Sequence, residues 1–187
     1  MTRPNSDVVA GDRNPDSRRT RLRDFQTKLV ERMQAVSSGA QVQAGQLGVM
    51  IGQTHWLLNL QEAGEIVSVG AITDVPLTQD WFLGVTSIRG NLVSVIDLAR
   101  FQGLAPTPLH KESRVVVFAP TLSFNCGLLV SRVMGLRNVT DMEPQGGADT
   151  DNAPWAVRRH LDRESRLWTE LDLSLIVQDA RFLQIGV

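Results

Sequence analysis

The apolar residues of this chain change their spacing at about residue 45. Between Leu22 and Val36 they recur at intervals of three and four, which places side chains on one face of a helix. This pattern predicts an amphipathic helix over residues 19–38, ended at Gly39. A surface helix of this kind packs either on its own domain or on a partner, and the pattern leaves both open.

The tail that precedes this segment has few groups to bury. Residues 1–18 are rich in Arg, Asp, Asn, Pro and Ser, so we expect them to be disordered. They contain no apolar stretch of the kind that a secretory signal needs. We therefore expect a cytoplasmic protein.

Beyond Gly45 the chain is a series of short Val-, Ile- and Leu-rich runs separated by turn residues. Parallel strands would need crossover helices between them, so this spacing favours small β-barrels or a sandwich. Residues 143–154 are expected to form a polar loop. The predicted strands are Leu47–Ile51, Trp56–Leu60, Ile66–Val69, Ile72–Val75, Val85–Ile88, Leu92–Ile96, Arg114–Phe118, Gly127–Val133, Val139–Met142 and Leu167–Leu171.

Two places in this body resemble each other. An apolar strand ends at Asp97 in one and at Asp172 in the other, and each Asp precedes a helical pattern. An Asp at that position accepts hydrogen bonds from the first backbone N–H groups of a helix. We interpret both residues as helix caps rather than as a catalytic pair of carboxylates, and the repeat suggests two related lobes.

Overall charge argues against binding to nucleic acid. The 19 Lys and Arg residues nearly balance 20 Asp and Glu residues, and the isoelectric point is about 6.3. Nucleic-acid-binding domains usually carry a strong excess of cations. Aromatic residues interleaved with cations, as on barrels that bind single strands, are also not found in the predicted strands.

The residues most often used in catalysis are scattered. His55, His110 and His160 lie far apart in the sequence, and none follows a recognisable catalytic motif. The single cysteine, Cys126, has no cation beside it in the sequence and is predicted to be buried. Arg158, Arg159 and Arg163 are interrupted by acids, which favours a solvated face over a phosphate site. We therefore expect no enzyme activity, no cofactor and no metal.

One hairpin carries a sharper signal. The strands Val85–Ile88 and Leu92–Ile96 flank Arg89-Gly90-Asn91, and Gly90-Asn91 is a favoured two-residue turn because glycine adopts positive φ freely. Arg89 then lies at the surface beside the turn. It could merely aid solubility, but an arginine offers a planar fork of five donors and is common among the residues that dominate protein contacts.

At this point the sequence resembles the CheW family of chemosensory adaptor proteins. The shared pattern consists of Val75-Pro76, Gly84-Val85, Arg89-Gly90, an aliphatic run, and Asp97-Leu98. A weaker resemblance extends from about Gly45 to Leu183. The helix over 19–38 and the run Trp81–Val85 are most similar to the CheW-like adaptor of type IV pilus systems.

The resemblance implies a fold and a function. It implies a CheW-like domain over 45–187, with two SH3-like five-stranded β-barrel lobes packed together. Such adaptors couple the cytoplasmic tip of a methyl-accepting chemoreceptor to a CheA-like histidine kinase, without membrane insertion, at membrane-associated receptor arrays. The residues expected to contact these partners are Trp81, Gly84, Val85, Ile88, Arg89 and Gly90.

Two other functions stay open from the sequence. A flagellar chemotaxis adaptor would share the same motif and differ only in output. A small β-barrel enzyme with an unrecognised active site would need titratable groups gathered in a pocket, whereas the sequence shows them dispersed. Control of twitching motility by type IV pili is our first expectation.

Overall fold

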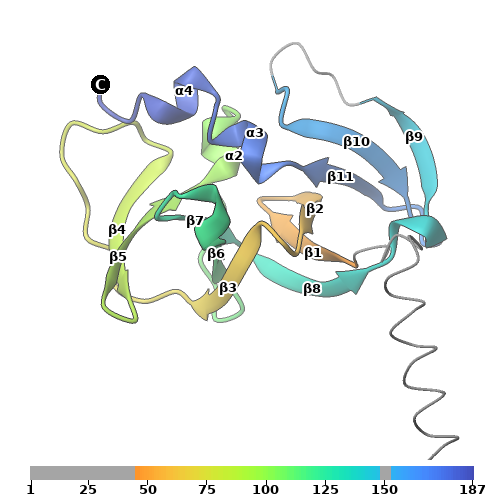
Figure 1. The fold of residues 1–187 in the computed structure, drawn as a ribbon, viewed down its shortest axis with the longest axis horizontal. Coiled ribbons are helices and arrows are strands. Elements are labelled where there is room, and N and C mark those ends of the chain that lie inside the picture. The colour runs from red at the N-terminus through yellow and green to blue at the C-terminus, as the bar shows by residue number, and fades with distance from the viewer. Residues whose placement is uncertain (1–44, 148–152) are drawn as a thin grey trace, which may run out of the picture. The chain divides into compact units, whose positions relative to one another are not determined.

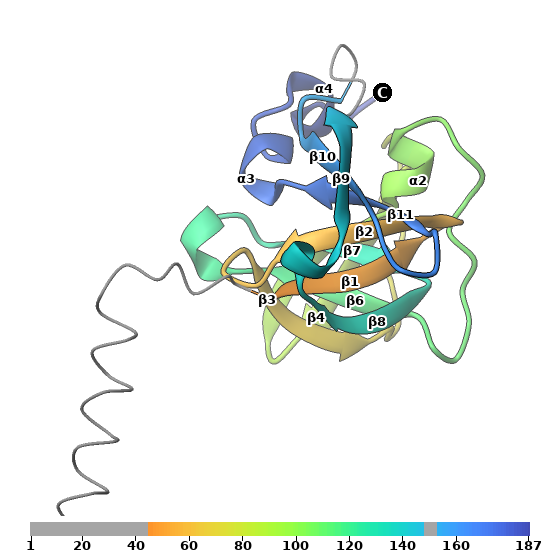
Figure 2. The ribbon, with the colours of Figure 1, turned by 90° about the vertical axis from the view of Figure 1, so that its right-hand side faces the viewer.

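The computed structural model describes residues 45–147 and 153–187, and this part of the chain is mainly β (Figures 1 and 2). Its strands form two sheets, one of six strands and one of five. The tail predicted over 1–18 and the helix predicted over 19–38 lie outside the described residues.

The six-stranded sheet, which we call the first lobe, joins strands from both ends of the described chain. Its order is β8-β1-β2-β11-β10-β9, and all neighbours are antiparallel except β2 and β11. The strands are β1 (Gln46–Ile51), β2 (Thr54–Asn59), β8 (Arg132–Arg137), β9 (Glu143–Gly147), β10 (Ala156–Leu161) and β11 (Leu167–Leu171).

The five-stranded sheet, or second lobe, is built from the middle of the chain. Its order is β3-β6-β7-β5-β4, with one parallel pair, β5 and β7. All five strands send side chains into one small apolar cluster around Val95, Val115 and Leu129, so the sheet curls around it. The strands are β3 (Ala63–Ser68), β4 (Phe82–Ile88), β5 (Asn91–Ile96), β6 (Arg114–Phe118) and β7 (Cys126–Val130).

A larger core joins the two lobes. Strands of both sheets contribute to it, together with α2 (Leu98–Phe101), α3 (Leu173–Ile176) and α4 (Ala180–Leu183). Removing one such side chain from water contributes on the order of 1.5–3 kcal/mol, so this shared core holds the lobes together.

The two predicted helix caps are confirmed. Asp97 accepts a hydrogen bond from the Ala99 N–H (3.1 Å), and Asp172 accepts one from Leu175 (2.9 Å). Each Asp also donates its backbone N–H to the carbonyl of a tryptophan that precedes a strand, at 2.9 Å in both lobes. The suggested relation between two lobes therefore extends over whole hairpins.

The class of fold is as expected, and one sheet has the expected five strands whereas the other has six. The additional strand, β9, lies within the segment that was predicted to be a loop. Its neighbour β10 lies where no strand was predicted. Pro144 and Gly146 of β9 disfavour a central strand but are tolerated at the edge of a sheet. In β10, Arg158 faces solvent and hides the apolar alternation.

Three other predicted strands differ from the structure. Ile72–Val75 holds only an isolated bridge between Thr73 and Val85. Val139–Met142 contains a short 3₁₀ helix, η2 (Val139–Asp141), instead of a strand. Asn138 caps this helix, because its side-chain oxygen accepts a hydrogen bond from the Thr140 N–H. The run Gly127–Val133 is split between β7 and β8, because the Ser131 N–H bonds to Met50 and the chain passes into the other lobe.

Candidate functional site

The candidate site is built around the turn between β4 and β5. The two strands stay paired up to Ile88 and Asn91, so the turn consists of Arg89 and Gly90. Both have positive φ (49° and 83°), as in a type I′ turn. The sequence had placed the turn at Gly90-Asn91. Gly90 does lie in the turn, but its companion there is the preceding residue, Arg89, because Asn91 already belongs to β5.

This turn holds the Arg89 side chain out of the sheet. The side chain is 79% exposed, and its Nη2 atom lies 2.7 Å from Oε1 of Glu65 on β3. Strands β3 and β4 are the two edges of the five-stranded sheet, so the ion pair bridges the two edges. Exposed pairs of this kind stabilise a fold by only about 0–1 kcal/mol. The pair therefore orients the guanidinium more than it stabilises the lobe.

Beside this ion pair lies a groove of about 350 Å³. Its apolar lining comes from the end of the hairpin, from β6, and from the 3₁₀ helix η1 (Pro120–Leu122) with the segment that follows it. Glu65, Arg89 and Asn91 add polar groups to the same lining. An apolar hollow with an arginine beside it has the composition of a protein contact site. The apolar side chains are Ile88, Val93, Val117, Phe118, Pro120 and Phe124.

Gly84 has a structural function in this hairpin. Its φ is +121°, and a Cβ atom at this position would lie 2.1 Å from the carbonyl oxygen of Thr73. The close approach allows Thr73 and Val85 to exchange two backbone hydrogen bonds of 2.8 and 2.9 Å. The glycine thus lets residue 73 cover the outer edge of β4, and a direct contact between Gly84 and a partner stays a prediction.

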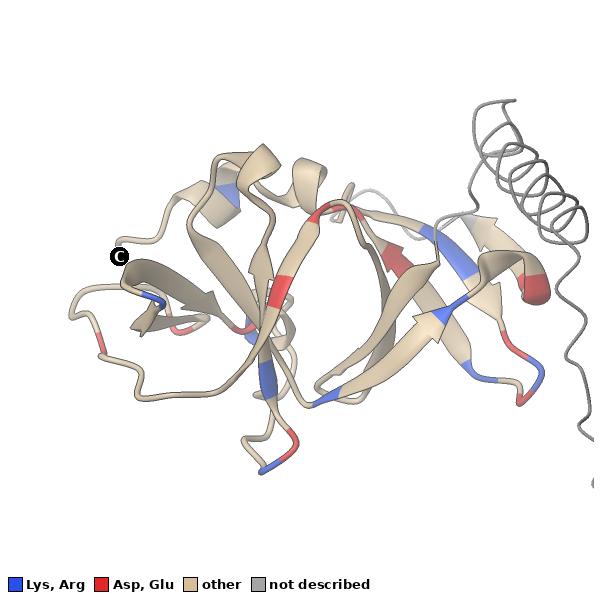
Figure 3. Cartoon of the chain, turned by 60° about the horizontal axis from the view of Figure 1, so that its bottom comes forward, with Lys and Arg blue, Asp and Glu red and all other residues tan. Residues whose placement is uncertain are grey.

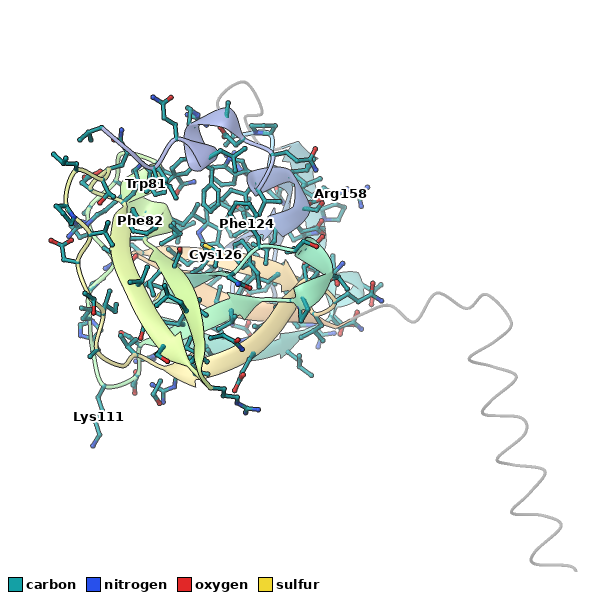
Figure 4. All side chains as sticks on the ribbon, turned by 60° about the vertical axis from the view of Figure 1, so that its left-hand side comes forward. Trp81, Phe82, Lys111, Phe124, Cys126 and Arg158 are labelled. Carbon is teal, nitrogen blue, oxygen red and sulfur yellow. The ribbon has the colours of Figure 1, made fainter. Side chains whose placement is uncertain are left out.

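Trp81 lies inside the protein, with 6% of its surface exposed. It stacks on Phe182 at 5.8 Å between ring centroids and meets Phe101 edge-on at 5.1 Å. In Figure 4 it lies in the interior near Phe82 and Phe124. Little of the ring is available to a partner, so its predicted role as an anchor has no support from this position, and we regard Trp81 as a core residue.

The two remaining predicted contact residues face different surroundings. Val85 packs against the shared core, whereas Ile88 lines the groove. Arg89, Gly90 and Ile88 are therefore brought together at the turn, with Val85 on the core side of the same strand. Glu65 was not predicted, since nothing in the sequence indicates that β3 passes beside this turn.

The residues considered for catalysis do not gather in one place. Cys126 is buried, and burial raises the pKa of its thiol to about 12, so it is held in the unreactive form. His160 is also buried, with Nε2 2.7 Å from Oε1 of Glu170. Burial, followed by the charge of Arg166, lowers the pKa of His55, which packs against Trp168.

Charge on the described residues is mixed. Cations and anions are interspersed along the ribbon in Figure 3, and Arg158 points away from the domain in Figure 4. Among residues 45–147 and 153–187, no three His, Cys, Asp or Glu side chains are arranged to hold a metal ion. No helix in this part of the chain is long and apolar enough to cross a membrane.

Comparison with known proteins assigns the family. Residues 46–181 match the model of the CheW-like domain. The protein PilI of Pseudomonas aeruginosa is 32% identical over 92 residues, which cover 49% of this chain and 51% of PilI. The chemotaxis protein CheW of Thermotoga maritima is 24% identical over 114 residues, which cover 61% of this chain and 74% of that protein. The match thus spans only about half the length of PilI.

A solved structure has the same fold. The scaffolding protein TtCheW from Thermoanaerobacter tengcongensis superposes with a TM-score of 0.58 at 20% identity, over 70% of this chain and 89% of the other. The match of the family model covers most of the chain and includes the whole hairpin with Arg89. The chain belongs to the CheW-like domain family.

Proposed function

We propose that this protein is a non-enzymatic adaptor that couples a methyl-accepting chemoreceptor to a CheA-like histidine kinase. The observation that carries the proposal is the Arg89–Gly90 turn, which holds an exposed guanidinium beside an apolar groove in a CheW-like domain. TtCheW, which has the same fold, is itself a scaffolding protein. An adaptor needs no catalytic group, only surfaces that bind proteins.

The groove suits a helix of the receptor tip. A helix can insert one or two apolar side chains between Ile88 and Phe124 while it places a carboxylate against Arg89. To do so, that carboxylate must replace Glu65, whose bond to Arg89 is exposed and therefore weak. The bidentate geometry of arginine makes the contact directional.

Signalling then follows from differential contacts. A receptor state that presents its helix better to the groove favours one arrangement of adaptor and kinase. The kinase responds only as far as the contact energies of the two states differ. The adaptor contributes a connection between two partners and no chemical step.

The output we propose is type IV pilus twitching motility, with the protein in the cytoplasm at receptor arrays. The support is the similarity to PilI, which extends over half of each chain. Flagellar chemotaxis is the alternative, and the similarity to CheW of Thermotoga maritima fits it. Deletion of the gene separates them: loss of twitching with normal swimming supports the first, and the reverse supports the second.

The direct test measures binding of a purified cytoplasmic receptor fragment by calorimetry. Arg89→Ala should weaken this binding about tenfold or more, as expected for a residue that dominates a contact. Arg158→Ala is the matched control, because Arg158 is also an exposed arginine of a strand in the other lobe. Equal affinity of wild type and Arg89→Ala, with the fold intact by circular dichroism, would contradict the proposal.

A further inference from the structure

The two lobes differ on the side of each sheet that faces away from the shared core. In the second lobe this side carries a small apolar cluster. In the first lobe, polar and ionisable side chains alternate with the core positions along the strands, and we call this side the polar face. Its members include Gln46, His55, Arg137, His160 and Glu170. Burying such groups costs free energy, so the polar face is a candidate for a function beyond packing.

Trp168 lies at the centre of the polar face and is fully buried. The guanidinium carbon of Arg137, on β8, lies 5.1 Å from the centroid of its ring, and that of Arg166 lies 6.0 Å from it. The His55 ring, on β2, lies 4.8 Å from the indole between centroids. Three basic side chains from different parts of the lobe therefore meet at one indole. A ring attracts each cation, but the cations repel one another.

The backbone and one carboxylate hold this cluster in place. A Cβ atom at Gly48 would lie 3.0 Å from both Cγ of Arg137 and Cζ3 of Trp168, so glycine leaves the room in which the arginine crosses to the ring. Asp162 accepts hydrogen bonds from the indole N–H (2.8 Å) and from Nε of Arg166 (2.7 Å). The one carboxylate of the cluster is therefore already bonded to two other members.

Other charged groups near this face are paired. Nε2 of His160 lies 2.7 Å from Oε1 of Glu170, and Arg132 at the start of β8 pairs with Glu112 at 2.5 Å. His55 differs from them, because no residue within 45–147 or 153–187 forms a hydrogen bond or ion pair with its ring. The two histidines of the polar face thus have opposite surroundings: one lies beside a carboxylate and the other beside two guanidinium groups.

We propose that His55 is a pH-sensitive switch of the first lobe. As a neutral ring it packs on the indole beside two cations, and as an imidazolium it adds a third positive charge to a cluster with one carboxylate. The repulsion is relieved when Arg137 or Arg166 leaves the ring. Both lie at margins of the lobe, because β8 is an edge strand and residues 162–166 form the tip of a hairpin. Acid therefore loosens β8 and this tip and leaves the second lobe unchanged.

The direction of the pH effect follows from the surroundings of His55. Burial and, next, the charge of Arg166 lower the pKa of His55 below its ordinary value of 6.5, and Arg137 adds to this. The folded pKa is below the unfolded one, so the unfolded chain binds more protons between the two values. The stability present above pH 6.5 is therefore lost as the pH falls through 6.5 toward the folded pKa. Asp162, with a pKa of about 2, keeps its charge throughout this range.

The experiment compares the full chain at about pH 7.5 and about pH 5.5, on either side of the ordinary histidine pKa. Hydrogen exchange, corrected for the intrinsic rate, should show a loss of protection in 132–137 and 162–166 at the lower pH and none in 114–118 of the second lobe. The urea midpoint should fall with pH in the wild type and fall less in His55→Gln. His110→Gln is the matched control, because this histidine is exposed and lies in the connection between α2 and β6. It should keep the fall seen in the wild type.

A second variant tests the cluster itself. Arg137→Gln removes one cation from the indole and should raise the pH at which the His55 ring titrates, followed by nuclear magnetic resonance of the ring protons. The chain has only three histidines, so their signals can be assigned by substitution. Titration of His55 at or above pH 6.5 in the wild type would overturn the proposal. An equal loss of protection in both lobes, or a full fall of the urea midpoint in His55→Gln, would overturn it too. None of these outcomes depends on the adaptor function.

Discussion

The two lobes contain hairpins of the same design that end differently. In the second lobe Trp81 precedes β4 and Asp97 follows β5, and in the first lobe Trp155 precedes β10 and Asp172 follows β11. In each, the Asp N–H donates to the tryptophan carbonyl at 2.9 Å and its carboxylate caps a short helix. The frame that positions the two hairpins is thus the same.

The tips of the hairpins differ in how their polar groups are satisfied. The connection 162–166 in the first lobe closes on Asp162, which accepts bonds from the N–H of Arg166 (2.8 Å), its Nε (2.7 Å) and the indole of Trp168 (2.8 Å). The tip of the second lobe leaves Arg89 exposed, beside Glu65. A tip whose polar groups bond to each other offers less to a partner, so the comparison favours the second lobe as the binding lobe.

The largest effect is expected for Gly84→Ala. The corresponding residue of the first lobe is Arg158, which carries a full exposed side chain, whereas a Cβ at Gly84 would collide with Thr73. We expect a loss of about 3 kcal/mol or more in the free energy of unfolding, measured with urea. Gly135→Ala is the control: its φ is also positive, at +83°, but the space around it is open, so the cost should be about 1 kcal/mol. Equal losses of unfolding free energy in Gly84→Ala and Gly135→Ala would show that the close approach of Gly84 to Thr73 does not distinguish the two lobes.

The next effect concerns the closed tip. Burial by itself would raise the pKa of Asp162, but the hydrogen bonds from Trp168 and Arg166 outweigh it and hold the pKa at about 2. The folded pKa is below the unfolded one, so this stabilisation is present above the ordinary pKa near 3.8 and is lost as pH falls toward 2. Asp162→Asn should lower the free energy of unfolding by about 1–3 kcal/mol at neutral pH.

The difference between Asp162→Asn and wild type should shrink as the pH is lowered, because the wild-type carboxylate is then protonated. Urea unfolding at several pH values measures this. Glu164→Gln is the control: its carboxylate is 62% exposed and also pairs with Arg166, so its loss should cost little at any pH. A difference that stays constant with pH would contradict the ionised bonds inferred for Asp162.

These comparisons also show which features can be predicted from sequence. Two strands, Arg114–Phe118 and Leu167–Leu171, were predicted with their correct ends, and each buries neighbouring residues on both of its faces. The caps Asp97 and Asp172 were predictable because capping is local chemistry. The edge strand Glu143–Gly147 was missed because its residues satisfy no core pattern.

The site was predictable only in part, for a similar reason. Arg89 and Gly90 stand next to each other in a motif, so the turn could be located. Glu65 and Phe124 reach the same groove from other strands and loops, and only the pairing of strands brings them there. The sequence could not show whether Trp81 is a buried core residue or an exposed contact residue. An aromatic residue before a strand is compatible with both, and only its stacking on Phe182 decides between them.

The smallest effect on stability is expected for Arg89→Gly, which separates the fold of the hairpin from its function. Arg89 has a φ of 49°, a conformation that costs a non-glycine residue roughly 1 kcal/mol, and its ion pair with Glu65 returns about 0–1 kcal/mol. The two nearly cancel, so urea unfolding should change by less than about 0.5 kcal/mol. Binding of the receptor fragment should nevertheless weaken about tenfold. Arg89→Lys keeps the charge without the planar fork, so its affinity for the receptor fragment should lie between those of the wild type and Arg89→Gly. A marked loss of stability with unchanged binding would mean that Arg89 serves the turn rather than a partner, and the second lobe would then have no advantage over the first.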